Sequence, residues 1–122
     1  IEDHEFDLLK VRDLGPAIRS RGMAWHHLPI EDVHVPDQRF HQAWPRVAPD
    51  LVGRLRSGGR VVVHCRGGLG RSGLVAALLV IEFGAEPVEA IRAVRASRPG
   101  AIETREQERF VAAYRPVVRD RA

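Results

Sequence analysis

Cysteine and long apolar runs are scarce in this sequence, and each scarcity excludes a class of protein. One cysteine among 122 residues cannot form an internal disulfide. No stretch approaches the roughly 18 uninterrupted apolar residues of a membrane-spanning helix, and the longest run, residues 74–81, suits a buried helix. The acidic, polar start of the chain is unlike a secretory signal. We therefore predict one cytoplasmic domain over residues 1–122, with no membrane partner.

The positive charge is almost entirely arginine, because Lys10 is the one lysine. A formal net charge of +3 and a sequence pI of about 10.0 favour anionic partners in general. The arginines are spread along the chain rather than clustered, so we predict no nucleic-acid partner. An arginine-rich composition also follows from genome composition, and by itself it identifies no ligand. The oligomeric state is not indicated by any feature of the sequence.

The apolar pattern predicts alternating helices and strands, which is typical of an α/β domain. Pro45 and Pro49 fall inside one helical pattern and predict a break there. The β-branched run 60–64 predicts a central strand covered on both faces. We expect a small, mostly parallel sheet flanked by helices on both sides. The expected strands are 23–28 and 60–64, and the expected helices are 16–21, 37–56, 71–83, 87–97 and 104–115.

Two strands are too few for a stable sheet, so either strands escape detection or further sheet precedes Ile1. Ile1 itself is expected to be the end of such a strand.

A glycine-rich loop joins the 60–64 strand to the next helix. Glycines at 67, 68 and 70 let the backbone curl without a Cβ in the way. A strand end, a tight loop and a helix N-terminus aim several backbone N–H groups at one point, which is a binding site for an anion such as phosphate. The predicted phosphate-binding residues are Arg66, Gly67, Gly68, Leu69, Gly70 and Arg71.

Cys65 lies at the edge of this predicted anion site. A helix N-terminus and cationic neighbours favour the thiolate, which could then attack a bound phosphorus. Arg71, six residues later, can reach two phosphate oxygens after a loop that curls back. Ser72 can hydrogen-bond the departing sulfur, and His64, directly before the cysteine, can orient the loop.

Other interpretations use the same residues. Residues 68–73 match a dinucleotide-binding fingerprint, but that motif needs a following parallel strand where 87–97 is expected to be helical. A Walker loop needs a lysine that the loop lacks. Cys65 could be a buried structural residue, or a redox-sensing thiol whose disulfide would have to be intermolecular.

The string HCRGGLGRSG is the signature of the protein tyrosine phosphatase superfamily and most resembles its dual-specificity, kinase-associated (cyclin-dependent kinase inhibitor type) branch. The strings WHHLPIEDVHVPD and VRASRPGAIETREQERFV resemble the acid loop and another active-site segment of that branch, so the resemblance covers most of residues 24–112. It implies a phosphatase acting through a phosphocysteine on phosphotyrosine, and also on phosphoserine or phosphothreonine. The loop interior has a single extra cation, Arg66, whereas lipid phosphatases of the superfamily tend to have more basic residues there. The resemblance therefore favours a phosphoprotein over a lipid substrate. The alternative is a phosphate-reading module with weak or no turnover.

The resemblance assigns the general acid to Asp32 and a supporting role to Gln107. The rival acid, Asp37, follows a proline where a helix N-cap belongs. Gln107 either places the hydrolytic water or closes a capping box with Thr104. This chemistry needs no metal or cofactor. His26 and His27 point to opposite faces of the expected strand, so they are not expected to share a metal ion.

Overall fold

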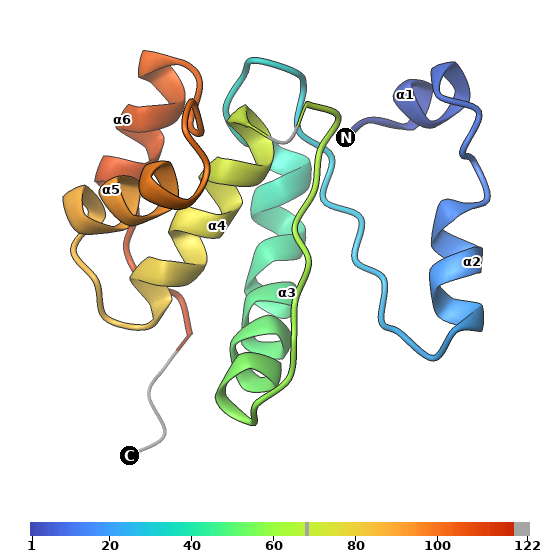
Figure 1. Cartoon of the computed structure of the whole chain (residues 1–122), viewed down its shortest axis with the longest axis horizontal. Coiled ribbons are helices and arrows are strands. Elements are labelled where there is room, and N and C mark those ends of the chain that lie inside the picture. Colours follow the sequence, from blue (N-terminus) through green and yellow to red (C-terminus); the bar gives the residue numbers. More distant parts are fainter. Residues whose placement is uncertain (68, 119–122) are drawn as a thin grey trace.

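The computed structural model describes residues 1–67 and 69–118, and Figure 1 shows its helices. The expected helices over 71–83, 87–97 and 104–115 are confirmed to within two residues at either end. The helices are α1 (Asp3–Leu8), α2 (Leu14–Ser20), α3 (Gln38–Arg56), α4 (Gly70–Glu82), α5 (Pro87–Ser97) and α6 (Arg105–Ala113). None of them is both long and apolar enough to cross a bilayer.

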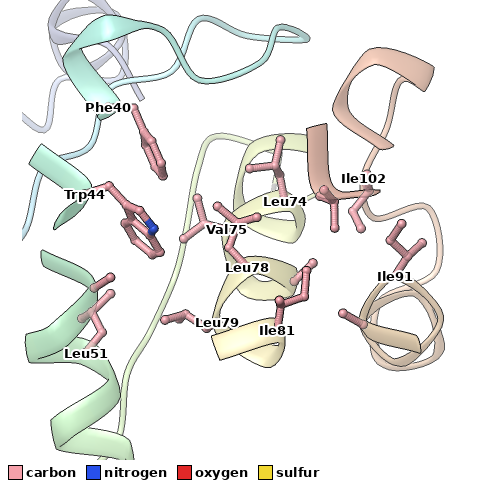
Figure 2. Close-up of a cluster of buried hydrophobic side chains, with 14 of the residues drawn as sticks. Phe40, Trp44, Leu51, Leu74, Val75, Leu78, Leu79, Ile81, Ile91 and Ile102 are labelled. Atoms are coloured by element: carbon pink, nitrogen blue, oxygen red, sulfur yellow. The ribbon is translucent and has the colours of Figure 1, made fainter. Parts of the chain in front are cut away.

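Helix α4 lies at the centre of the hydrophobic core, because it is apolar around most of its circumference. It packs against α3 on one side and against α5 and α6 on the other. Figure 2 shows Val75 and Leu79 pointing toward Trp44 and Leu51 of α3. The start of α4, which follows the glycine-rich loop, is therefore held in a fixed position by the core.

The predicted break in α3 is wrong, since the helix continues through Pro45 and Pro49. Both prolines lie on the exposed face, where water can bond the carbonyl groups that lose their helical partners. On the opposite face Phe40, Trp44 and Ala48 are buried at four-residue spacing. Burial of this face against the core holds the helix together across both prolines.

The expected sheet is not found in the described part of the chain. Residues 23–31 and 59–65 are largely extended, but no backbone hydrogen bond joins them and neither is a strand. Val62, expected on a central strand covered on both faces, is 86% exposed. Among the described residues, neither segment has a second strand to pair with, so the β-branched composition does not by itself give a strand.

A largely apolar cavity of about 650 Å³ separates the two extended segments. Its lining includes Ile1, residues 22–28 and residues 60–65, so both segments border it. Cys65, Arg71 and Ser72 also line the cavity. The chemically interesting residues therefore face a hollow rather than a packed interface.

Candidate active site

Cys65 and Ser72 meet where the extended segment 59–65 gives way to α4. The Cys65 sulfur lies 3.3 Å from the Ser72 hydroxyl oxygen, which is hydrogen-bonding distance. Ser72 is buried in the first turn of α4, and Cys65 is partly exposed. A hydroxyl so placed can donate to a thiolate, as the sequence predicts. Gly68 lies outside the described residues, so its predicted part in phosphate binding stays a prediction.

Two glycines allow residues 101–107 to approach the start of α4 closely. A Cβ on Gly70 would lie 2.7 Å from a carboxylate oxygen of Glu103 and 2.9 Å from the Gln107 amide oxygen. A Cβ on Gly73 would lie 2.9 Å from that of Ala101. All three distances are shorter than ordinary van der Waals contacts. The residues before α6 can therefore pack directly against the loop that carries Cys65.

Arg71 is held by Glu5, a residue that the sequence analysis did not assign to the site. Its Nη1 and Nη2 atoms donate to the two carboxylate oxygens of Glu5 at 2.7 and 2.9 Å. Nη1 also donates to the Ile30 carbonyl at 3.0 Å. The pair is buried, with Arg71 only 3% exposed. The bond to Arg71 lowers the pKa of Glu5 to about 2, and Glu5 in turn raises the pKa of Arg71.

Glu5 does not occupy every edge of the Arg71 guanidinium. Glu5 binds the end of the planar group, which is formed by Nη1 and Nη2. The side edge, where the Nε hydrogen and the second Nη2 hydrogen are parallel, does not contact Glu5. Nε is buried and has no hydrogen-bond partner among the described residues. Asp32 Oδ1 lies 3.5 Å from Nη2. A buried donor without an acceptor is costly, and an anion bound at this edge would satisfy it.

Asp32 and Asp37 occupy different environments, as the sequence predicts. The Asp32 side chain is 64% exposed and lies beside Arg71 at the mouth of the site. Asp37 caps α3, where its carboxylate accepts from the Arg39 backbone N–H at 2.9 Å. Asp37 also pairs with the Arg39 side chain, which lowers the pKa of its carboxyl group. Of these two aspartates, Asp32 is the one that lies beside Arg71.

The remaining predicted loop residues are more peripheral. His64 is exposed and packs on Trp25 with ring centroids 5.9 Å apart, and its Nδ1 lies 3.4 Å from the Cys65 carbonyl oxygen. Arg66 and Gly67 are exposed, while Leu69 is half-buried. The Leu69 carbonyl accepts from Gly73 and Ile102 N–H groups, which fixes the end of the loop.

Gln107 is fully buried and closes the expected capping box at the start of α6 with Thr104. Its amide nitrogen also donates to the carbonyl of His34, on the loop that carries Asp32.

His26 and His27 have separate partners within the chain. His26 hydrogen-bonds Asp50 at 2.9 Å, and His27 bonds the Ile1 carbonyl. Over residues 1–67 and 69–118, no three histidine, cysteine or acidic side chains group closely enough to hold a metal ion.

Comparison with known proteins places this geometry in context. Residues 17–111 match the model of a phosphatase domain described as "PTP-SAK: Swiss Army Knife protein, DSP-PTPase phosphatase domain". The chain is 34% identical over 114 residues to cyclin-dependent kinase inhibitor 3 of Rattus norvegicus, covering 91% of this chain and 52% of that protein. It is 32% identical over 102 residues to PRL-1 phosphatase of Drosophila melanogaster, covering 84% of this chain and 57% of that protein.

Solved structures of phosphatases are also similar to this chain. A kinase-associated phosphatase with its catalytic-site cysteine replaced by serine superposes with a TM-score of 0.78 and 31% identity, over 90% of this chain and 62% of that one. The active form of Tk-PTP gives 0.65 and 38% identity, over 76% and 61%. The chain spans about half the length of the curated relatives it matches.

Proposed function

Because this chain belongs to the family of DSP-PTPase phosphatase domains, we propose that it removes phosphate from phosphorylated protein side chains through a phosphocysteine at Cys65. The observation that carries the proposal is the arrangement at one end of the cavity. There the Cys65 sulfur lies against the Ser72 hydroxyl, and Arg71 offers a buried Nε that has no partner in residues 1–67 and 69–118. Nucleophile, oxyanion donor and sulfur partner thus come from a single segment, the loop that precedes α4 and the first turn of that helix.

In the first step, the Cys65 thiolate attacks phosphorus and the bond to the substrate oxygen breaks. Arg71 binds two of the three non-bridging oxygens through Nε and Nη2, and backbone N–H groups of the loop bind the third. Asp32, in its protonated form, gives its proton to the departing oxygen. The products are a free phenol or alcohol and a phosphate group on sulfur.

In the second step, the Asp32 carboxylate takes a proton from water while the water oxygen attacks the phosphocysteine. The P–S bond breaks, inorganic phosphate leaves, and the thiolate returns. The Ser72 hydroxyl, 3.3 Å from the sulfur, donates to the thiolate as it departs. Asp32 then holds the proton needed for the next cycle, so no further acid is consumed.

The proposed substrates are phosphoproteins. The names of the relatives, which include protein tyrosine phosphatases and a kinase-associated phosphatase, support this choice. Arg66 is exposed beside the loop and can contribute one extra positive charge toward an anionic peptide. Activity on phosphotyrosine, with phosphoserine and phosphothreonine as further substrates, is part of the proposal.

The test is hydrolysis of a generic aryl phosphate in the presence of a chelator. We expect turnover in the unmodified chain, none in Cys65→Ser, and a loss of about 10²–10⁴-fold in Asp32→Ala for a poorly leaving phenol. Asp37→Ala is the matched control, because it removes a nearby aspartate that caps α3. That variant should lose about 1 kcal/mol of stability and keep its turnover.

The alternatives give different results. Phosphate binding without turnover, abolished by Arg71→Ala, would indicate a phosphate-reading module. Turnover that is lost in chelator, or that survives in Cys65→Ser, would overturn the proposed mechanism.

A further inference from the structure

Gln107 has more polar contacts than a helix cap requires. Its backbone N–H donates to the Thr104 hydroxyl at 3.0 Å, and its amide oxygen accepts from the N–H groups of Glu103 and Thr104 at 2.9 and 3.2 Å. These bonds complete the cap of α6 through the amide oxygen alone. The amide NH₂ group takes no part in them, although the side chain is 0% exposed.

The NH₂ group of Gln107 instead contacts the loop that carries Asp32. Its nitrogen donates to the His34 carbonyl at 3.0 Å, across 73 residues of sequence. Buried amide groups are almost always hydrogen-bonded, so this contact gives the NH₂ group its partner. One side chain therefore joins the start of α6 to the acid loop, which we define as residues 31–36.

The acid loop is locally strained at the residue beside Asp32. Val33 has a φ of 58°, a conformation that a β-branched side chain rarely adopts. Within the loop, Asp32 Oδ1 accepts from the Val33 N–H at 3.0 Å, and the His34 N–H donates to the Glu31 carbonyl at 3.0 Å. Such strain persists only where surrounding contacts impose it. The Gln107 bond is a contact of this kind from outside the loop.

Gln107 also lies against the end of the phosphate loop. A Cβ added to Gly70, the first residue of α4, would be 2.9 Å from its amide oxygen and 3.1 Å from its amide nitrogen. The Gln107 amide is thus packed between the segment that follows Cys65 and the loop that carries Asp32. Its oxygen is committed to two backbone N–H groups, which leaves it poorly suited to bind a reacting water.

We propose that Gln107 is a positioning residue that holds the acid loop so that Asp32 lies beside Arg71, rather than a residue that places the hydrolytic water. This inference rests on the proposed function for its catalytic consequence. Loss of the bond between Gln107 and the His34 carbonyl frees the loop to relax at Val33, and Asp32 moves away from the leaving oxygen. The defect therefore falls on protonation of the leaving group.

The test is Gln107→Glu, which keeps an oxygen acceptor for the cap and replaces the NH₂ donor. Two aryl phosphates are compared, one with a strongly acidic phenol and one with a weakly acidic phenol, because only the second needs a general acid. We expect kcat/KM to fall about tenfold or more for the second substrate and at most about twofold for the first. In an Asp32→Ala background, Gln107→Glu should cause no further loss, because the two residues act as one unit.

Thr104→Ala is the matched control, since it weakens the same α6 cap and leaves the NH₂ group in place. It should reduce stability without the dependence on leaving group. If Gln107→Glu does not fold, Gln107→Asn serves instead, because it keeps the amide but is one methylene too short to span both partners.

A separate readout does not need activity. Amide hydrogen exchange at residues 32–35 should accelerate in Gln107→Glu and stay slow in Thr104→Ala. Unchanged exchange would overturn the inference whether or not the chain is a phosphatase. Equal losses on both substrates, or a burst of phenol followed by slow turnover, would also overturn it, because a burst indicates a defect in the water step. A chain with no turnover but with accelerated exchange would contradict the proposed function alone.

Discussion

Two regions of this molecule differ in how much of their contact with the rest of the chain is polar. Helices α3 to α6 pack through apolar side chains around α4 (Figure 2). Residues 1–31 meet that helical core through apolar contacts of Ile30 and Leu28, and also through polar contacts such as the Glu5–Arg71 pair and the bond from Arg71 to the Ile30 carbonyl. His26 adds a bond to Asp50 of α3.

The difference explains where the chemistry lies. Apolar packing fixes the start of α4 and with it Cys65, Arg71 and Ser72. Polar contacts then bring Asp32 and Glu5 to that fixed point, where they set the geometry of the site. Substitutions in the apolar core should therefore affect folding with little effect on the activity of the folded chain, whereas substitutions in the Glu5–Arg71 pair should affect both.

The largest effect is expected from Glu5→Gln. Removing one partner of a buried ion pair leaves the other charge uncompensated, which costs about 3–5 kcal/mol. Arg71 also loses the contact that directs its free edge, so inhibition by inorganic phosphate should weaken together with kcat/KM. Denaturant unfolding and phosphate inhibition measure the two effects. Glu2→Gln is the control, because its pair with Arg39 is exposed and should contribute at most about 1 kcal/mol.

On the helical side, Leu78→Ala should lower the free energy of unfolding by about 2–5 kcal/mol, because Leu78 is completely buried in α4 and its removal leaves a cavity. Under conditions where the variant remains folded, kcat/KM should change little. A variant with normal stability but lost activity would contradict the separation between the two regions.

The pH dependence of stability tests the Glu5–Arg71 pair again. The pKa of Glu5 is lowered from 4.5 to about 2 in the folded chain, so the folded state prefers the carboxylate. Its contribution to stability is present above pH 4.5 and is lost as the pH falls toward 2. The difference in unfolding free energy between the unmodified chain and Glu5→Gln should therefore shrink between pH 5 and pH 2. A constant difference would show that the pair does not titrate as described.

The smallest effect is expected from Val62→Thr. Val62 is 86% exposed, so the substitution should change the free energy of unfolding by less than about 0.5 kcal/mol. A valine packed in a central strand would cost considerably more. A large loss measured by thermal unfolding would indicate that the 59–65 segment is covered in solution.

Sequence reasoning succeeded where structure is decided locally. The helices over 70–97 follow from apolar periodicity, glycine and proline signals, and the cap at Asp37 follows from its position before a helix. Cys65 and Ser72 lie together because seven residues of loop and helix bring them there.

Sequence reasoning failed where contacts between distant segments decide the local structure. The runs 23–28 and 60–64 have strand composition, yet strands need neighbours, and an apolar cavity lies between these two. In α3, burial of one face overrides the prolines on the other. Glu5 had an evident local role in the first turn of α1, and no sequence signal pointed to Arg71, which is 66 residues away.

The most direct test of the central claim is detection of phosphate on Cys65. Asp32→Ala, mixed rapidly with an aryl phosphate whose phenol leaves without acid assistance, should complete the first step and stall at the second. Quenching and mass spectrometry of the peptide that contains Cys65 should then find a phosphorylated sulfur that decays as inorganic phosphate appears. Phenol release with no phosphate on Cys65, or with phosphate on another residue, would contradict the phosphocysteine mechanism.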